Sequence, residues 1–214
     1  GVPRPARYDD VLVLCRRRAR LAEYERALRN AGIPYVTSSR GGLLRTLEAE
    51  DLCALLCFLA SPADDLALAH ALRTPLFALT DDDLLRIVRT GDAASSWWMR
   101  LGRLAQADAA DASDSGETGP IARAHRLLGR WLDLSGHLPV HDLLDRIYFE
   151  GEITARTRAI VPPAAWPSVA ANLDAFIAAS LQLDAARYPS LPRFIDELAR
   201  LADADDEAPD EGVI

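Results

Sequence analysis

The chain has 214 residues, half of them hydrophobic and about a quarter charged, which is the composition of a soluble globular protein with enough apolar material for one large domain or two smaller ones. No apolar run reaches the roughly 18 residues of a membrane span, no signal peptide opens the chain, and three cysteines are too few for a disulfide scaffold, so we expect a cytoplasmic protein. The net charge of −8 is uneven, because residues 1–46 carry +6 and residues 47–214 carry −14. A basic surface facing phosphate would explain this split, and so would an ordinary amphipathic helix rich in arginine.

All 24 basic residues are arginine, and the absence of lysine excludes one class of nucleotide site. The phosphate-loop motif GxxxxGK[ST] needs a lysine that reaches the β- and γ-phosphates of ATP. This chain does not contain that motif, so we expect no ATP turnover from it alone.

The N-terminal part predicts a strand–helix–strand unit of an α/β sheet. Residues 11–14 (VLVL) form a short apolar run between two aspartates and an arginine cluster, which is typical of a buried strand. Residues 21–28 place apolar side chains at helical spacing and are followed by the stop signal Gly32. Residues 33–36 (IPYV) predict a second short strand, in which the proline suits an edge position.

From residue 48 onward the sequence predicts helices only. Apolar residues recur every three or four positions in segments that we place at 48–60, 61–72, 80–88, 96–108, 121–135, 139–150, 167–181 and 190–202. We expect the second of these helices to begin at Ser61–Pro62, and Thr80 to be the N-cap of the third. An Asp-, Ser- and Gly-rich loop spans 108–119, and the acidic residues 203–214 indicate a linker.

Several short segments, taken in chain order, resemble the UvrD/RecB/AddA group of superfamily 1 DNA helicases. They are the strand ending in Arg16, YERAL at 24–28, GIPY at 32–35, EAEDL at 48–52, SPADD at 61–65, LRTPLF at 72–77, NLD at 172–174 and YPSL at 188–191. The segment LRTPLF, followed by TDDDL at 80–84, is closer to the AddA/RecB branch than to the UvrD/Rep branch.

This resemblance implies a mostly α protein with a small α/β portion. Residues 1–75 would form the first half of a RecA-like domain (2A), residues 76–202 an all-helical 2B-type domain, and residues 203–214 a linker leading back to 2A. The family's next segment, V-x-V-M-T-I-H-x-x-K-G-L-E, is absent, so we expect a fragment of a larger protein. The intact protein would be an ATP- and Mg-dependent DNA helicase–nuclease of double-strand break repair. It would act on DNA and not at a membrane, together with an AddB- or RecC-like partner subunit. This fragment alone would bind no cofactor.

The resemblance also assigns roles to individual residues. Arg16 matches the motif IV arginine, which reaches the γ-phosphate of ATP held mainly by the other RecA-like domain, and a planar, permanently charged guanidinium suits that task. Without the family, Arg16 would belong to a solvated basic helix start. Arg40 and Gly41 lie in a loop that could bind DNA phosphate or be a plain surface turn.

Two more DNA contacts are expected at the end of the predicted helix 61–72. Arg73 and Thr74 correspond to positions near the translocating single strand, although an arginine at a helix end can also bond backbone carbonyls. In UvrD-like members a G-I-G segment then holds duplex DNA. The matching residues here are 78–80 (ALT), and the three aspartates at 81–83 would repel phosphate, so this route to DNA is doubtful.

The remaining conspicuous residues favour structural roles. Trp97 and Trp98 could stack on bases, but inter-helix packing explains them better. His137 and His141 have the spacing of a metal pair, but a proline lies between them and no third ligand is spaced for zinc, so we predict no metal site. Two other classes of function stay open: a free-standing helical interaction module derived from a helicase, and an enzyme using Asp81–Asp83, for which a solvated helix N-terminus is the simpler explanation.

Overall fold

A computed structural model describes residues 7–11, 13, 24, 27–28, 31–33, 43–92, 94–111, 119–183 and 190–206. Within these residues the fold is helical and contains no strand, as the mostly α prediction requires. The elements in chain order are η1 (Tyr8–Asp10), η3 (Leu43–Arg45), α2 (Leu47–Ala60), α3 (Asp65–Arg73), α4 (Asp81–Arg89), α5 (Trp97–Asp111), α6 (Pro120–Ser135), α7 (Val140–Gly151), α8 (Ile153–Ile160), α9 (Trp166–Leu183) and α10 (Leu191–Asp206).

The predicted strand–helix–strand unit lies mostly outside the described residues. Tyr24 and the pair 27–28 are helical, in agreement with the helix predicted at 21–28. The buried strand predicted at 11–14 is not seen where it can be examined, because Val11 and Val13 are 65% and 62% exposed. A parallel strand is buried by neighbouring strands and by helices on both faces, and the described part of the chain provides no partner strand.

Two helix boundaries differ from the sequence prediction. The helix placed at 61–72 begins later, at Asp65, because the residue before a proline is driven out of the helical region and Ser61 accordingly ends α2. Asp64 is its N-cap, and the carboxylate accepts the Ala67 amide at 2.9 Å. The N-cap predicted at Thr80 is confirmed as a reciprocal capping box with Asp83.

Helix α8 was not predicted from the sequence. It follows α7 directly, and the corner between them is made by Glu152, which adopts the left-handed conformation with φ 57°. A non-glycine residue enters this region at an energetic cost, so the sequence alone gives no turn signal here.

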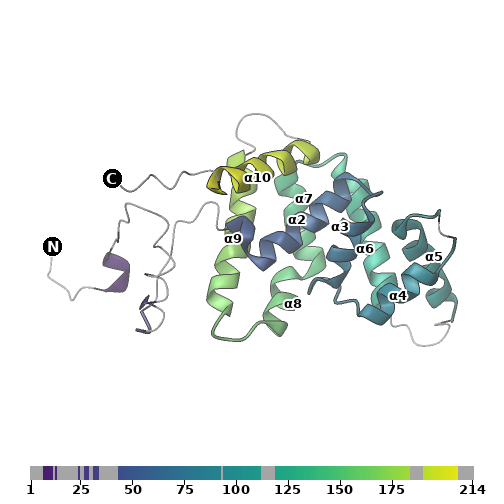
Figure 1. The fold of residues 1–214 in the computed structure, drawn as a ribbon, viewed down its shortest axis with the longest axis horizontal. Helices are drawn as coiled ribbons and strands as arrows, with labels where there is room; N and C mark the ends of the chain where they lie inside the picture. Colours follow the sequence, from purple (N-terminus) through teal and green to yellow (C-terminus); the bar gives the residue numbers. More distant parts are fainter. Residues whose placement is uncertain are drawn as a thin grey trace.

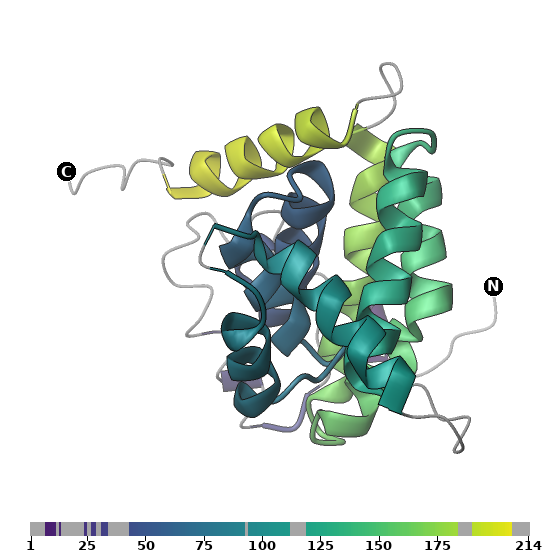
Figure 2. The ribbon, with the colours of Figure 1, turned by 90° about the vertical axis from the view of Figure 1, so that its right-hand side faces the viewer.

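Helix α2 is the centre of the fold. It is apolar around most of its circumference, with Leu52, Leu55, Leu56 and Phe58 all nearly or fully buried, and a helix of this kind is stable only inside a core. It packs against α3, α6, α9 and α10. In Figure 1 the other helices surround it, and Figure 2 shows α10 crossing over one end of the body.

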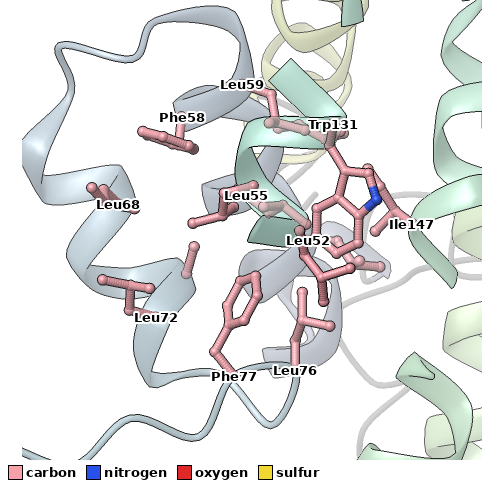
Figure 3. Close-up of a cluster of buried hydrophobic side chains, with 14 of the residues drawn as sticks. Leu52, Leu55, Phe58, Leu59, Leu68, Leu72, Leu76, Phe77, Trp131 and Ile147 are labelled. Atoms are coloured by element: carbon pink, nitrogen blue, oxygen red, sulfur yellow. The ribbon is translucent and has the colours of Figure 1, made fainter. Parts of the chain in front are cut away.

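The hydrophobic core is continuous on both sides of residue 75. Trp131 of α6 is fully buried, and its ring centroid lies 6.1 Å from that of Phe77. Figure 3 shows Trp131 beside Leu52 of α2 and Ile147 of α7. The division into a 2A part ending at 75 and a 2B part beginning at 76 stays a prediction, since helices assigned to both parts share this core. None of the helices in the described ranges is long and apolar enough to cross a membrane.

Candidate nucleic-acid interface

Only two of the predicted site residues lie in the described part of the chain. Arg16, the predicted ATP-cleft arginine, and the predicted DNA-binding loop residues Arg40 and Gly41 lie outside it. Arg73 and Thr74 are the last residue of α3 and its C-cap, respectively. The structure therefore brings together one pair of the predicted residues, and their roles in binding stay predictions.

The two neighbours differ in what they can offer a ligand. Thr74 is buried, and its hydroxyl donates to the Ala71 carbonyl oxygen at 2.7 Å, so this group already serves the helix end. Arg73 does not bond backbone carbonyls in any described contact. Its side chain is 62% exposed and lies 3.3 Å from Asp81 Oδ1, an arrangement of surface charges that holds little energy. Arg73 is thus free to meet a phosphate, whereas Thr74 is not.

The turn that follows α3 is tightly built. The Ala78 amide donates to the Thr74 carbonyl at 2.7 Å, and the Leu79 amide donates to the Leu72 carbonyl at 3.0 Å. Ala78, which stands where the resembling helicases have the first glycine of G-I-G, has φ 53°. The left-handed backbone of that glycine is therefore retained although the residue is not glycine.

One arginine of α6 fastens this turn to the α7–α8 corner. Arg123 Nη1 donates to the Leu76 carbonyl at 2.8 Å, and Nη2 donates to the Gly151 carbonyl at 3.2 Å. The two segments also touch directly, since a Cβ added at Gly151 would lie 2.6 Å from Leu76 Cδ1. Glu152 is the only acid paired with this guanidinium within the described ranges, at 3.8 Å.

Arg123, Arg126 and Arg156 form a cluster, referred to below as the arginine cluster. Burial lowers the pKa of Arg123, and the nearby charges of Arg156 and Arg126 lower it further, against the opposing effect of Glu152. Arg156 Nη2 lies 3.2 Å from Glu152 Oε2, while its Nε is buried and has no hydrogen-bond partner in the described part of the chain. Arg126 is exposed and has no acidic partner there.

Sequence reasoning missed this cluster for a definable reason. Arg123, Arg126 and Arg130 are spaced i, i+3 and i+7 on a helix that was predicted, so their common face could have been noticed. Arg156 belongs to α8, which was not predicted. Its approach to Arg123 depends on the left-handed corner at Glu152.

The tryptophan pair packs between helices, as predicted. The Trp98 ring stacks on the imidazole of His125 with centroids 4.8 Å apart, and it lies 5.6 Å from the Phe58 ring. Burial lowers the pKa of His125. Because its face is already covered by an imidazole, Trp98 is not an open platform for a base.

The histidines that resemble a metal pair are held by other contacts. The His137 amide donates to the Leu134 carbonyl at 3.0 Å, while His141 Nδ1 lies 3.0 Å from Ser180 Oγ. No group of three or more histidine, cysteine or acidic side chains in the described segments is placed to hold a metal ion.

The aspartates at 81–83 likewise have structural partners. Asp83 closes the capping box with Thr80, and Asp81 faces Arg73. This geometry supports the helix N-terminus interpretation over acidic catalysis.

A polar contact joins two of the segments that carry the helicase resemblance. Asn172 Nδ2 of α9 donates to Glu48 Oε1 of α2 at 2.5 Å. Tyr148 of α7 donates its hydroxyl to the carbonyl of Leu173 at 3.0 Å, and burial raises the pKa of this tyrosine. The two contacts fix α9 against the central helix and against α7.

Comparison with known proteins agrees with the resemblance. Residues 2–115 match the model of the UvrD-like helicase C-terminal domain. The chain is also similar to AddA proteins, which are named as the first of the subunits of an ATP-dependent helicase/nuclease. It is 24% identical over 207 residues to that of Geobacillus kaustophilus, which covers 97% of this chain and 16% of the relative. It is 28% identical over 208 residues to that of Heliobacterium modesticaldum, which covers 95% of this chain and 15% of the relative.

A third relative matches a shorter part of the chain more closely. The protein of the same name from Leuconostoc mesenteroides is 31% identical over 105 residues, which is 49% of this chain and 8% of the relative. The chain thus spans about a sixth or less of the length of these relatives. Since the family model covers more than half of its residues, the chain belongs to the UvrD-like helicase C-terminal domain family.

Proposed function

We propose that this chain is part of an ATP-dependent DNA helicase–nuclease of double-strand break repair, to which it contributes part of RecA-like domain 2A and a helical 2B-type domain. The observation that carries the proposal is the similarity to AddA helicase/nuclease proteins along 95–97% of the chain, in relatives that are several times longer. The intact protein would work in the cytoplasm.

In this proposal the ATP site is completed by polypeptide other than this chain. The chain has no lysine, so the phosphate loop that holds ATP and Mg must lie elsewhere in the motor. Arg16 would reach across the cleft to the γ-phosphate, where a fixed positive charge stabilises the charge that develops during phosphoryl transfer. Its expected place after an apolar segment suits the usual location of ligand sites in α/β sheets.

The helical body would contact DNA or an AddB- or RecC-like partner protein. Its core is continuous from α2 to α10, so it would move as one unit against the rest of the motor. Arg73, exposed at the end of α3, is the described residue best placed among the predicted contacts to meet the DNA backbone. Arg40 and Gly41 would add a second contact from the preceding loop.

ATP hydrolysis tests the proposal. We expect no DNA-stimulated ATPase from the isolated chain, and in the intact parent protein we expect Arg16→Ala to lower kcat about 10³-fold, the lower range for loss of an arginine finger. Arg17→Ala is the matched control and should leave kcat within a few-fold. Turnover by the isolated chain, or equal effects of the two substitutions in the parent, would contradict the assignment. A gene that encodes this chain alone would favour the interaction-module alternative.

A further inference from the structure

We propose that the arginine cluster binds the phosphodiester backbone of DNA, with Arg126 and Arg156 as the contacting side chains and Arg123 as a fixed charge behind them. The inference rests on the proposed function, because that function makes DNA the polyanion this protein meets. It adds a binding surface formed by α6 and α8 to the contacts expected at Arg73 and in the loop at 40–41.

The first argument is an imbalance of charge. Glu152 is the only acid paired with the three guanidinium groups in the described residues, so the cluster carries an excess of positive charge. The first turn of α6, where Arg123 lies, contains no acidic residue. Like charges held close together repel one another, and an anion bound between them removes that repulsion. The excess stands out because residues 47–214 as a whole carry −14.

The second argument is that the cluster is built before any ligand arrives. The two carbonyl bonds of Arg123 immobilise its guanidinium, which is only 18% exposed and so presents charge rather than a free donor fork. Arg156 holds Glu152 through a single Nη2 contact and leaves its buried Nε without a partner in the described contacts. A site whose charges are already fixed loses little conformational entropy when it binds.

The third argument is that the surface has room beside the cluster. A shallow groove of about 590 Å³ runs along α6 from Arg126, and its lining residues are His125, Arg126, Gly129, Arg130, Asp133 and Leu134. Arg130 is 59% exposed and bonds Glu150 at 2.9 Å, so only part of its guanidinium is occupied. A polyanion that meets the arginine cluster can therefore continue along a path with a further arginine.

An acidic protein segment is the competing polyanion. Arginine recognises phosphate and carboxylate alike through its planar donor fork, so the cluster alone does not distinguish them. DNA is favoured because the chain belongs to a helicase family and because the acidic remainder of the body would confine a polyanionic strand to this basic surface.

Salt-dependent binding measured with matched variants tests the inference. We would measure fluorescence anisotropy of a labelled duplex, and of a single strand of the same sequence, against the full 214-residue chain across a salt series. The variants are wild type, Arg126→Gln/Arg156→Gln and the control Arg146→Gln. Arg146 is exposed on α7 and makes no ion pair with a described residue, so the control removes the same kind of charge away from the cluster.

We expect the double variant to bind about tenfold more weakly at low salt, while Arg146→Gln binds as wild type does. Each lost phosphate contact lowers the slope of log K against log salt by about 0.9 for duplex and about 0.7 for single strand, so the double variant should lose about 1.8 or about 1.4. The larger loss identifies which form of DNA the cluster contacts. Thermal unfolding of all three chains within about 2 °C would show that folding is unchanged, as expected of exposed surface positions.

Three results would overturn the inference. They are equal weakening by the double variant and by Arg146→Gln, binding of an acidic polyglutamate peptide as tight as that of DNA, and no DNA binding by the wild-type chain at low salt. None of these touches the ATPase test of Arg16 in the parent protein. Failure of this surface and failure of the proposed function are therefore separately visible.

Discussion

Replacing Arg123 by methionine tests whether the fold depends on the hydrogen bonds that join three distant segments. The guanidinium on α6 bonds the carbonyl of Leu76, 47 positions away in the chain, and the carbonyl of Gly151, 28 positions away. Methionine keeps much of the side-chain length and apolar contact but donates no hydrogen bond. Both carbonyls would lose their charged donor.

The expected loss can be worked from these contacts. A hydrogen bond to a charged group contributes about 1.5–3 kcal/mol. Arg123 is 18% exposed, so water partly replaces the lost donors and the lower end of the range applies to each bond. The contact with Glu152 at 3.8 Å is loose and adds little. We therefore expect the free energy of unfolding to fall by about 3 kcal/mol, which is about a hundredfold in the unfolding equilibrium.

Urea denaturation followed by far-UV circular dichroism measures this loss, with Arg126→Met as the matched control on the same helix. The control removes an exposed charge whose neighbours are also arginines, so stability should change by less than about 0.5 kcal/mol or rise slightly. A loss below about 1 kcal/mol for Arg123→Met, or equal losses for the two variants, would refute the claim that Arg123 holds the turn and the corner together.

Two further predictions concern the same body. Gly151→Ala should lower the free energy of unfolding by about 1–3 kcal/mol, because the new Cβ would meet Leu76 Cδ1 at 2.6 Å in a packed core, whereas Gly136→Ala, with nothing within 4 Å, should be neutral or stabilising; thermal melts that rank them the other way would show that the core yields freely. His125 should titrate below 6.5 by NMR, because burial lowers its pKa. The unfolded imidazole then takes up its proton first as pH falls from about 6.5, so stability present above that pH is lost as pH drops through the folded pKa. His125→Gln should remove this share of the pH dependence, and an unchanged profile would count against it.

The helices could be predicted from sequence because their signals are local. The capping box at Thr80 needs only residues within one turn, and the apolar periodicity of α2 already marks it as a core helix. The start of α3 was misplaced because the sequence does not say whether Pro62 opens the helix or precedes its cap, and Asp64 turned out to be the cap. The role of Arg16 stays a prediction.

The sequence by itself determined the helical class, most helix positions and, through an ordered series of short segments, membership of a helicase family. Only the tertiary structure decided that Arg123 serves two backbone carbonyls and gathers Arg126 and Arg156 beside it. The physical reason is distance along the chain. Helix formation is governed by neighbours three or four residues apart, whereas the arginine cluster exists because packing around α2 and a left-handed corner at Glu152 bring separate helices together.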